Sequence, residues 1–197
     1  MVQAVAFLPD LPGFLASASS NTVKYWELAT GQCQQRLGGY SDSRRAITFS
    51  PDSRTLAFAT KKPFFETIEV CHLATQSQQT LKGHRRFVNS VAFSHDSTLL
   101  ASASDDKTIM IWDLAAFRCR GTPGGHYGRV MSVAISPDPR LLASASIDGD
   151  IKIWDQTISR SQQTLIGHSG TVKSVAFSHD SRLLASASAD RTIMSGT

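Results

Sequence analysis

Histidine, serine and aspartate side chains recur along this chain at one spacing, and together they could catalyse hydrolysis. In a serine hydrolase the serine is the nucleophile, the histidine removes its proton and the aspartate orients the histidine. The three sets are His84, Ser102 and Asp106, then His126, Ser144 and Asp148, then His168, Ser186 and Asp190. Their regular spacing requires an explanation, either in catalysis or in structure.

Repetition favours a structural explanation, because an active site is not expected in every unit at the same spacing. A degenerate second unit supports this view, since Tyr40, Phe58 and Val70 stand where the histidine, the serine and an accompanying tryptophan are expected. Losing one partner of a buried polar network strands the others, whereas losing all of them can be nearly neutral. The sequence shows no phosphate-binding glycine-rich loop and no metal-ligand motif. We therefore expect no enzymatic activity, no cofactor and no bound metal.

The elements that position these side chains follow a repeat. A Val-Ala-Phe-Ser-Pro-Asp-like element recurs at steps of 42, 44, 42 and 42 residues, ending at Asp10, Asp52, Asp96, Asp138 and Asp180. In the third unit, alternation of apolar and polar residues predicts strands at Val88–Phe93, Leu99–Ala103, Thr108–Leu114 and, more weakly, Phe117–Thr122. Four short antiparallel strands per repeat describe one blade of a β-propeller.

Two dipeptides recur with the repeat. Gly-His occurs at Gly83-His84, Gly125-His126 and Gly167-His168, and Trp-Asp occurs at Trp112-Asp113 and Trp154-Asp155. The histidine lies 12 residues before the turn aspartate in all three copies, and 28 residues before the tryptophan in both complete ones. With these motifs the chain resembles the WD-repeat (WD40) β-propeller family. Its closely matched repeats, with Leu-Leu-Ala-Ser-Ala-Ser restated three times, are most similar to the WD arrays of fungal NACHT–WD-repeat proteins.

The resemblance implies an all-β fold of WD40 blades with four antiparallel strands each. It implies a single array over residues 1–197, forming an incomplete ring of about four and a half blades. The expected blades cover approximately 1–38, 39–82, 83–124 and 125–166, with a partial blade at 167–197. In the last, Ser195-Gly196-Thr197 replaces Ile111-Trp112-Asp113, as in a truncation or a change of reading frame. Because an open arc exposes two edges, we expect self-association through them.

The resemblance also assigns the recurring polar side chains to structural tetrads. The two complete tetrads are His84-Ser102-Asp106-Trp112 and His126-Ser144-Asp148-Trp154. The set around His168 lacks its tryptophan.

Partner contacts are implied at three positions per blade, namely the third and fifth residues after the histidine and the residue before the tetrad aspartate. In the three blades those positions hold Phe87, Asn89, Asp105, Arg129, Met131, Ile147, Thr171, Lys173 and Ala189, and all of these except Ala189 are assigned to the partner-binding face. Val88–Met110 and Val172–Met194 are identical at 19 of 23 positions, and two of the four differences fall on contact positions. Diversified recognition explains this pattern, and drift at exposed sites is the alternative.

Two further features allow more than one interpretation. Phe64 and Phe65, beside Lys61 and Lys62 in a long turn, could form an exposed aromatic patch. We favour the alternative in which at least one of them packs inward or belongs to the third strand. The arginine pairs at 44–45 and 85–86 could meet phosphate or carboxylates, and we favour a solvated rim.

Composition limits the class of protein. The 197 residues are 41% hydrophobic with a net charge of +4, and no stretch approaches the roughly 20 apolar residues of a membrane span. Three widely spaced cysteines, Cys33, Cys71 and Cys119, favour reduced thiols in an intracellular compartment, cytoplasmic or nuclear. Of these, Cys33 and Cys119 are expected to be small apolar fillers near fourth strands.

The sequence therefore predicts a non-catalytic protein–protein interaction scaffold, a fragment of a larger propeller protein. The mixed chemistry of the contact positions suits a protein or peptide partner and makes nucleic acid unlikely. The alternatives are the sensor segment of a fungal NACHT-type signalling NTPase and a WD-repeat adaptor such as a mitochondrial-fission adaptor.

Overall fold

The computed structural model describes residues 2–7, 13–19, 22–38, 46–62, 65–75, 77–122, 125–138, 140–155 and 160–196. Within these residues the chain forms 19 β-strands and no helix. The all-β fold predicted from the alternation of apolar and polar residues is confirmed.

The strands form five sheets, and within each sheet every strand pairs antiparallel with the next strand along the chain. The first sheet contains β1 (Val2–Phe7), β2 (Phe14–Ser19), β3 (Thr22–Glu27) and β4 (Cys33–Gly38). The second contains β5 (Ile47–Phe49), β6 (Thr55–Lys62), β7 (Phe65–His72) and β8 (Gln78–Lys82). The third contains β9 (Val88–Phe93), β10 (Leu99–Ser104), β11 (Ile109–Asp113) and β12 (Arg118–Gly121). The fourth contains β13 (Val130–Ile135), β14 (Leu141–Ser146), β15 (Ile151–Asp155) and β16 (Arg160–Leu165). The fifth contains β17 (Val172–Phe177), β18 (Leu184–Ser188) and β19 (Ile193–Gly196).

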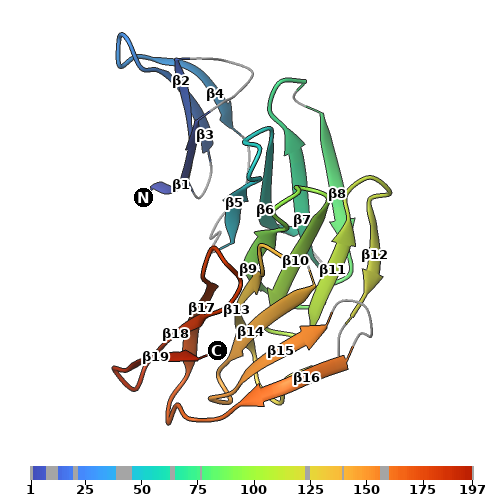
Figure 1. Ribbon diagram of the computed structural model, residues 1–197. Coiled ribbons are helices and arrows are strands. Elements are labelled where there is room, and N and C mark those ends of the chain that lie inside the picture. The colour runs from blue at the N-terminus through green and yellow to red at the C-terminus, as the bar shows by residue number, and fades with distance from the viewer. Residues whose placement is uncertain are drawn as a thin grey trace.

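The five sheets fan out in an open arc, with their first strands on the concave side (Figure 1). Consecutive first strands lie side by side, so that β9 contacts β5 and β13, and β13 in turn contacts β17. Four-stranded antiparallel sheets arranged in this way form an incomplete β-propeller, as predicted.

Turn chemistry explains why the strands of the third sheet end where they do. The Ser94 hydroxyl donates to the Asp96 carboxylate (2.5 Å), and the same carboxylate accepts the N–H of Thr98 (3.1 Å). Ser97, which lies between Asp96 and Thr98, adopts a positive φ of 60°, and this conformation closes the turn between β9 and β10. Short polar side chains that bond to nearby backbone favour turns over strand continuation.

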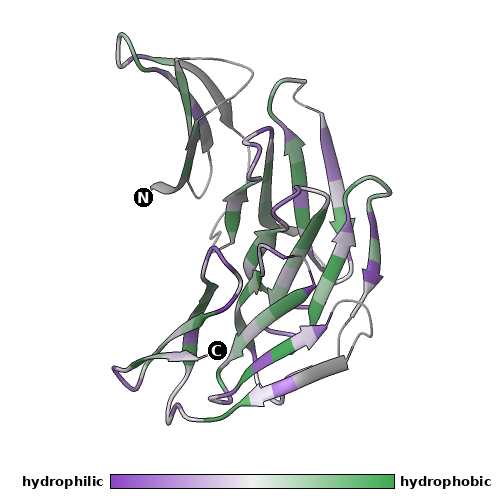
Figure 2. Cartoon of the chain, in the orientation of Figure 1, coloured by the Kyte–Doolittle hydropathy of each residue, from purple (hydrophilic) through white to green (hydrophobic). Residues whose placement is uncertain are grey.

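The core lies between successive sheets. Ala101, Ala103 and Ile109 of the third sheet are fully buried, and they pack against Val130 and Trp154 of the fourth. The contact between the fourth and fifth sheets repeats this chemistry. In both contacts a face of alanine and isoleucine packs against a face of valine and leucine on the next sheet, and in the fourth sheet Trp154 adds to this face. Figure 2 shows the hydrophobic residues gathered in the inner and middle strands, while β8 and β12 on the outside carry hydrophilic stretches.

The second sheet corrects the alignment expected from the sequence. Leu56 pairs with Cys71, as Leu100 pairs with Trp112 in the third sheet. Cys71, and not Val70, therefore occupies the tryptophan position. Phe58 does take the register of the tetrad serine, while Tyr40, the expected histidine substitute, lies outside the described residues.

The same sheet resolves part of the ambiguity at the long turn. Lys61 and Lys62 belong to β6, and Phe65 begins β7, so the turn is shorter than expected. The interpretation in which one of the two phenylalanines belongs to the third strand is confirmed for Phe65, whereas Phe64 lies outside the described residues.

The cysteines correct another expectation. Cys33 and Cys119 lie in the fourth strands β4 and β12, but both are exposed and are not fillers of the core. The reason is that a fourth strand lies at the outer edge of its sheet, away from the packed faces of the middle strands.

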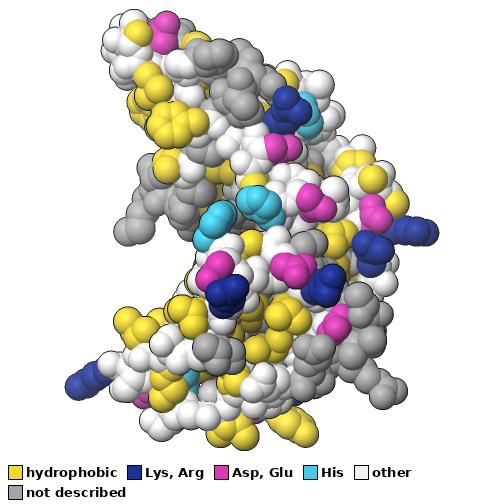
Figure 3. All heavy atoms as spheres, viewed as in Figure 1, with side chains coloured by type: hydrophobic (Ala, Val, Ile, Leu, Met, Phe, Trp, Pro, Cys, Tyr) yellow, Lys and Arg dark blue, Asp and Glu magenta, His cyan; other side chains and the backbone are white. Residues whose placement is uncertain are grey.

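The two end sheets expose the faces that are buried elsewhere. Val5 and Phe7 are 59% and 69% exposed, whereas their register equivalents in the third sheet, Val91 and Phe93, are 8% and 9% exposed. At the other end Ile193 is 79% exposed, whereas its equivalent Ile109 is fully buried. Figure 3 shows hydrophobic side chains at both ends of the arc, on either side of the notch that it encloses.

Candidate interaction face and the polar networks behind it

Four side chains of the third sheet form a continuous hydrogen-bonded chain. The indole Nε1 of Trp112 donates to Ser102 Oγ over 2.9 Å. Ser102 Oγ lies 2.7 Å from His84 Nε2, and His84 Nδ1 lies 2.9 Å from Asp106 Oδ2. The fourth sheet repeats the chain over 2.8, 2.7 and 3.2 Å through Trp154, Ser144, His126 and Asp148.

The direction of donation follows from the chemistry of the groups. An ionised carboxylate only accepts, so His84 Nδ1 carries the proton that it donates to Asp106. His84 Nε2 then accepts the Ser102 hydroxyl, which leaves the lone pairs of the serine oxygen for the indole N–H. Ser102 and Ser144 are both fully buried, which places their hydroxyl groups out of reach of a substrate in solution.

The local electrostatics favour an anionic aspartate and a neutral histidine. Burial raises the pKa of Asp106, but hydrogen bonds from His84 and Thr108 outweigh burial and hold this pKa well below its ordinary value. Burial lowers the pKa of His126 below 6.5, and the charge of Asp148 opposes this shift without cancelling it. The network of the fourth sheet is thus a donor–acceptor chain with its one negative charge on Asp148.

The remaining sheets hold partial or different networks. In the first sheet Trp26 Nε1 donates to Ser17 Oγ over 2.7 Å. In the fifth, His168 lies 2.8 Å from Ser186 Oγ and 2.9 Å from Asp190, but Gly196 occupies the tryptophan register opposite Leu184.

The second sheet is not simply apolar where the other sheets have their networks. Glu69 is only 3% exposed, and its carboxylate accepts hydrogen bonds from Thr80 Oγ1 (2.8 Å) and Gln78 Nε2 (3.2 Å). A carboxylate on β7 thus forms its own network toward β8. The expectation of largely apolar replacements missed this group.

The tetrad aspartates connect the networks to the surface. Asp106 Oδ2 accepts the backbone N–H of Arg85 over 2.9 Å, which ties the loop before β9 to the turn between β10 and β11. Asp148 holds the N–H of Tyr127 over 3.0 Å, and Asp190 holds that of Ser169 over 3.0 Å. In these three blades the networks therefore fix two loops against one another.

Gly83, which precedes His84, lies very close to the side chains of Trp112 and Met110. A Cβ atom at Gly83 would lie 2.9 Å from Cη2 of Trp112 and 2.7 Å from the sulfur of Met110. Only glycine therefore allows the loop to pass over the indole ring.

These loops, and the first strands that follow them, carry the residues that the resemblance assigns to partner contacts. We call the following eight the recognition face: Phe87, Asn89, Asp105, Arg129, Met131, Ile147, Thr171 and Lys173. The Asp105 N–H donates to the Phe87 carbonyl over 2.8 Å, and the Ile147 N–H donates to that of Arg129 over 3.0 Å. The Ala189 N–H donates to the Thr171 carbonyl over 2.8 Å. In each of three blades, the first and third contact positions are thus neighbours.

A polar cluster joins two of these blades across their seam. Asn89 Nδ2 donates to Asp105 Oδ1 over 2.7 Å and to the carbonyl of Val130, the first residue of β13, over 2.9 Å. Arg129 Nη1 lies 3.7 Å from Asp105 Oδ2. The structure thus brings Phe87, Asn89, Asp105 and Arg129 together, with Phe87 and the Arg129 side chain 47% and 58% exposed.

The other members of the recognition face are less tightly connected. Ile147 and Lys173 are exposed, while Met131 and Thr171 are half-buried. No hydrogen bond or ion pair in the described part of the chain joins the side chain of Met131 or Lys173 to the other members.

Sequence reasoning missed one exposed aromatic residue beside this face. Tyr127, in the same loop as Arg129, is 85% exposed, and Lys152 Nζ lies 5.6 Å from its ring centroid. The same ammonium donates to the Gly125 carbonyl over 3.2 Å. The corresponding residues of the neighbouring blades are Arg85 and Ser169, so the repeat pattern gave no signal for an aromatic residue here.

Arg85 and Arg86 are exposed, as both interpretations of the arginine pairs require, and residues 44–45 lie outside the described residues. Over the described ranges, no three His, Cys, Asp or Glu side chains are grouped as metal ligands would be. That part of the chain also lacks any helix long and apolar enough to cross a bilayer.

Comparison with known proteins agrees with this geometry. The fold and its repeated networks define a β-propeller built of sequence repeats. The model of the WD40 family, described as WD domain, G-beta repeat, matches residues 75–113, 117–155 and 159–194, more than half of the chain. The chain therefore belongs to the WD40 repeat family.

Curated relatives share only part of their length with this chain. Target of rapamycin complex subunit wat1 of Schizosaccharomyces pombe is 28% identical over 102 residues, 52% of this chain and 32% of that protein. Target of rapamycin complex subunit LST8-1 of Arabidopsis thaliana is 34% identical over 108 residues, 54% and 35% of the two chains. WD repeat and SOCS box-containing protein 1 of Xenopus tropicalis is 32% identical over 103 residues, 51% and 24%. The chain thus spans about a third of the first two relatives and about a quarter of the third.

Proposed function

We propose that this chain is a non-catalytic scaffold that binds a protein or peptide partner through the recognition face. The main supporting observation is the polar cluster at the seam between the third and fourth sheets, where Asn89 and Arg129 both contact Asp105 and the Arg129 side chain is 58% exposed. Membership of the WD40 family supports the proposal, as do the names of two relatives, which describe subunits of a protein complex.

The buried networks support a structural role for the His-Ser-Asp sets. A serine nucleophile must reach its substrate, but Ser102 is fully buried and its oxygen already contacts the Trp112 indole and His84. The aspartate turns its remaining acceptor capacity to loop N–H groups, as Asp106 does with Arg85 and Thr108. This accounts for the repetition of the set in three blades without any catalytic role.

The chemistry of the face indicates the class of partner. Exposed Phe87 and Ile147 supply apolar contact area, while Arg129 and Asp105 supply both signs of charge within one cluster. Interface energy concentrates in aromatic and arginine anchors, which makes Phe87 and Arg129 the central pair. A nucleic-acid duplex would require a more uniformly basic surface.

The exposed end faces support self-association as a second mode of contact. Ile109 is buried because the next sheet covers it, and Val91 and Phe93 are buried because the preceding sheet covers them. Ile193 at one end of the arc and Val5 with Phe7 at the other repeat these two complementary faces. A second copy could therefore dock head to tail, a heterologous contact that continues the stacking of blades.

The proposal extends to the kind of WD-repeat protein and to its location in the cell. Three copies of Leu-Leu-Ala-Ser-Ala-Ser favour a sensor segment of a fungal NACHT-type signalling NTPase within the general class, with an adaptor such as a mitochondrial-fission adaptor as the alternative. An intracellular location, cytoplasmic or nuclear, belongs to the same proposal, because all three cysteines are free thiols.

A peptide selection tests the proposed face. We would select a phage-displayed peptide library on the wild-type chain and measure the recovered peptides on Ile147→Lys, which places a charge at the centre of the face. The proposal requires that this change abolish binding of the dominant peptide family. Undiminished binding would place the site elsewhere, at the edges or near Phe65.

A further inference from the structure

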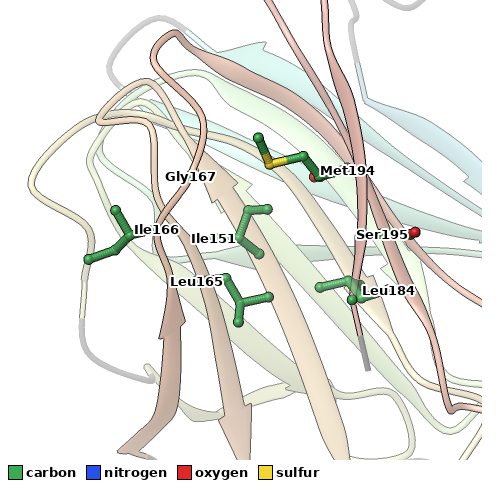
Figure 4. A pocket seen from close by; sticks show the side chains of 9 residues that line it. Ile151, Leu165, Ile166, Gly167, Leu184, Met194 and Ser195 are labelled. Atoms are coloured by element: carbon green, nitrogen blue, oxygen red, sulfur yellow. The ribbon is translucent and has the colours of Figure 1, made fainter.

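An apolar cavity lies between the fourth and fifth sheets, and none of the recognition face residues lines it. Its volume is about 170 Å³, and its lining includes Ile151, Leu165, Leu184, Ser186, Met194 and Gly196. In Figure 4, Ile151 and Leu165 project from one side, and Leu184 and Met194 from the other, toward the space between them. Nothing in the proposed scaffold function uses this cavity.

The cavity corresponds to the place where other blades hold a tryptophan ring. Trp112 belongs to a cluster that contains Ile68, Leu81 and Leu100. Ile68 pairs with Leu81 as Ile151 pairs with Leu165, and Leu100 pairs with Trp112 as Leu184 pairs with Gly196. The three aliphatic walls of the Trp112 site are therefore present in the cavity, and only the indole ring has been replaced by a glycine.

The polar contact of the ring is present as well. Ser186 is 4% exposed and lies 2.8 Å from His168 Nε2, as Ser102 lies 2.7 Å from His84 Nε2. Because the Asp190 carboxylate fixes the proton of His168 on Nδ1, the Ser186 hydroxyl donates to Nε2. Its oxygen then presents lone pairs toward the cavity, in the role that accepts the indole N–H in the third and fourth sheets.

We propose that this cavity binds the indole ring of a tryptophan side chain carried by an extended partner peptide, with the ring N–H donating to Ser186 Oγ. A peptide strand is a suitable carrier, because in each of the four other sheets a fourth strand pairs with the third. In those sheets Trp112 faces Cys119, and Trp154 faces Ser161. A peptide strand paired with β19 would place one side chain opposite Gly196 on the cavity side.

Indole itself is the first probe, and indene, which has the same shape without the N–H, is its matched control. Binding of each to the full chain would be measured by isothermal titration calorimetry. One neutral hydrogen bond contributes about fivefold in affinity, so indole should bind about five times more tightly than indene. Equal affinities, or no binding of either probe, would overturn the proposal.

Two variants locate the binding site. Gly196→Trp should fill the cavity, abolish indole binding and raise the melting temperature, because it restores the fourth member of the network. Ile193→Trp is the matched control, since it adds the same ring to the same strand at a residue that does not line the cavity. It should leave indole binding unchanged. Indole binding that survives Gly196→Trp would show that the ring binds elsewhere.

The hydrogen bond and the peptide are tested separately. Ser186→Ala should reduce indole affinity to that of indene, while an unchanged indene affinity shows that the cavity is intact. N-acetyl-tryptophanamide should bind with the same dependence on Gly196 and Ser186, and the phenylalanine analogue should bind about five times more weakly. If free indole binds but the tryptophan amide does not, a small molecule and not a peptide is the ligand, and the proposal is wrong.

Discussion

The guanidinium of Arg129 lies 3.7 Å from the carboxylate of Asp105, across the seam between the third and fourth sheets. The arginine side chain is 58% exposed and the aspartate side chain 17% exposed. Exposed ion pairs contribute little to stability, so the pair is better suited to orienting the arginine than to holding the sheets together. Asn89, which bonds to the same aspartate, adds a second fixed point.

A double-mutant cycle measures this relationship. We expect Asp105→Ala and Arg129→Ala to show a coupling free energy of about 0.2–1 kcal/mol in urea unfolding, as for other exposed pairs. A coupling well above that range would mean that the pair stabilises the seam, and that the recognition face is also a structural joint.

The tetrads should contribute to stability and not to catalysis. His126→Ala leaves Ser144 and Asp148 without their common partner in a buried site, which should cost about 1–3 kcal/mol in the free energy of unfolding. His95→Ala is the control, because that histidine is exposed in a surface turn, and it should cost much less. Unchanged stability of His126→Ala, together with loss of a hydrolytic activity, would contradict the structural role.

Stability should fall with acidification in two windows. Burial lowers the folded-state pKa of His126 below 6.5, so the unfolded chain binds the proton more readily and stability decreases as the pH falls below about 6.5. The pKa values of Asp106 and Asp148 are lowered from 3.8, despite burial, by hydrogen bonds and a nearby histidine. Their contribution is complete above about pH 4 and is lost as the pH falls further.

Urea unfolding from neutral to acidic pH would measure both windows. His126→Gln should flatten the upper window and leave the lower one in place. Stability that rises between neutral pH and pH 5 would contradict the neutral, buried histidine.

How far the sequence could be interpreted is clearest in the third and second sheets. Regular alternation predicted β9 with the bounds that the structure shows, and the resemblance to WD repeats identified all four members of the network around His84. In the second sheet the step of 44 residues hid two changes. Leu56 and Cys71 are 15 residues apart, against 12 between Leu100 and Trp112, and the rest of the unit is one residue shorter. The sequence shows only the net insertion of two residues and not where the residues are gained and lost. For this reason the alignment placed Val70, and not Cys71, at the tryptophan position.

The repeat pattern also could not predict contacts between blades. Each unit was aligned on its neighbours, so the pattern assigned Asp105 and Arg129 to separate blades without revealing that they meet. The cavity beside Gly196 depends on the walls that two sheets contribute, and only the strand register shows that they match the site of Trp112.

Self-association should depend on the end faces. The chain should associate with increasing concentration in sedimentation experiments, because burying Ile193 and Phe7 removes apolar surface from water. Phe7→Lys with Ile193→Lys should shift the equilibrium toward monomer. Tyr127→Lys, at a residue that is more exposed than either of these but lies away from the end faces, should not. A wild-type chain that remains monomeric and melts in one sharp transition would rule out this mode of contact.

The central claim is that the recognition face binds the partner, and affinities of a selected peptide for two matched double variants test it most directly. Phe87→Ala with Arg129→Ala removes an aromatic and an arginine from the face, while Phe117→Ala with Arg118→Ala removes the same pair from the opposite end of the third sheet. Phe87 and Phe117 are 47% and 43% exposed, so the two variants lose similar surface. We predict at least tenfold weaker binding, about 1.4 kcal/mol, for the first variant and no change for the second, with similar melting temperatures. Equal binding by the first variant and the wild-type chain would contradict the account.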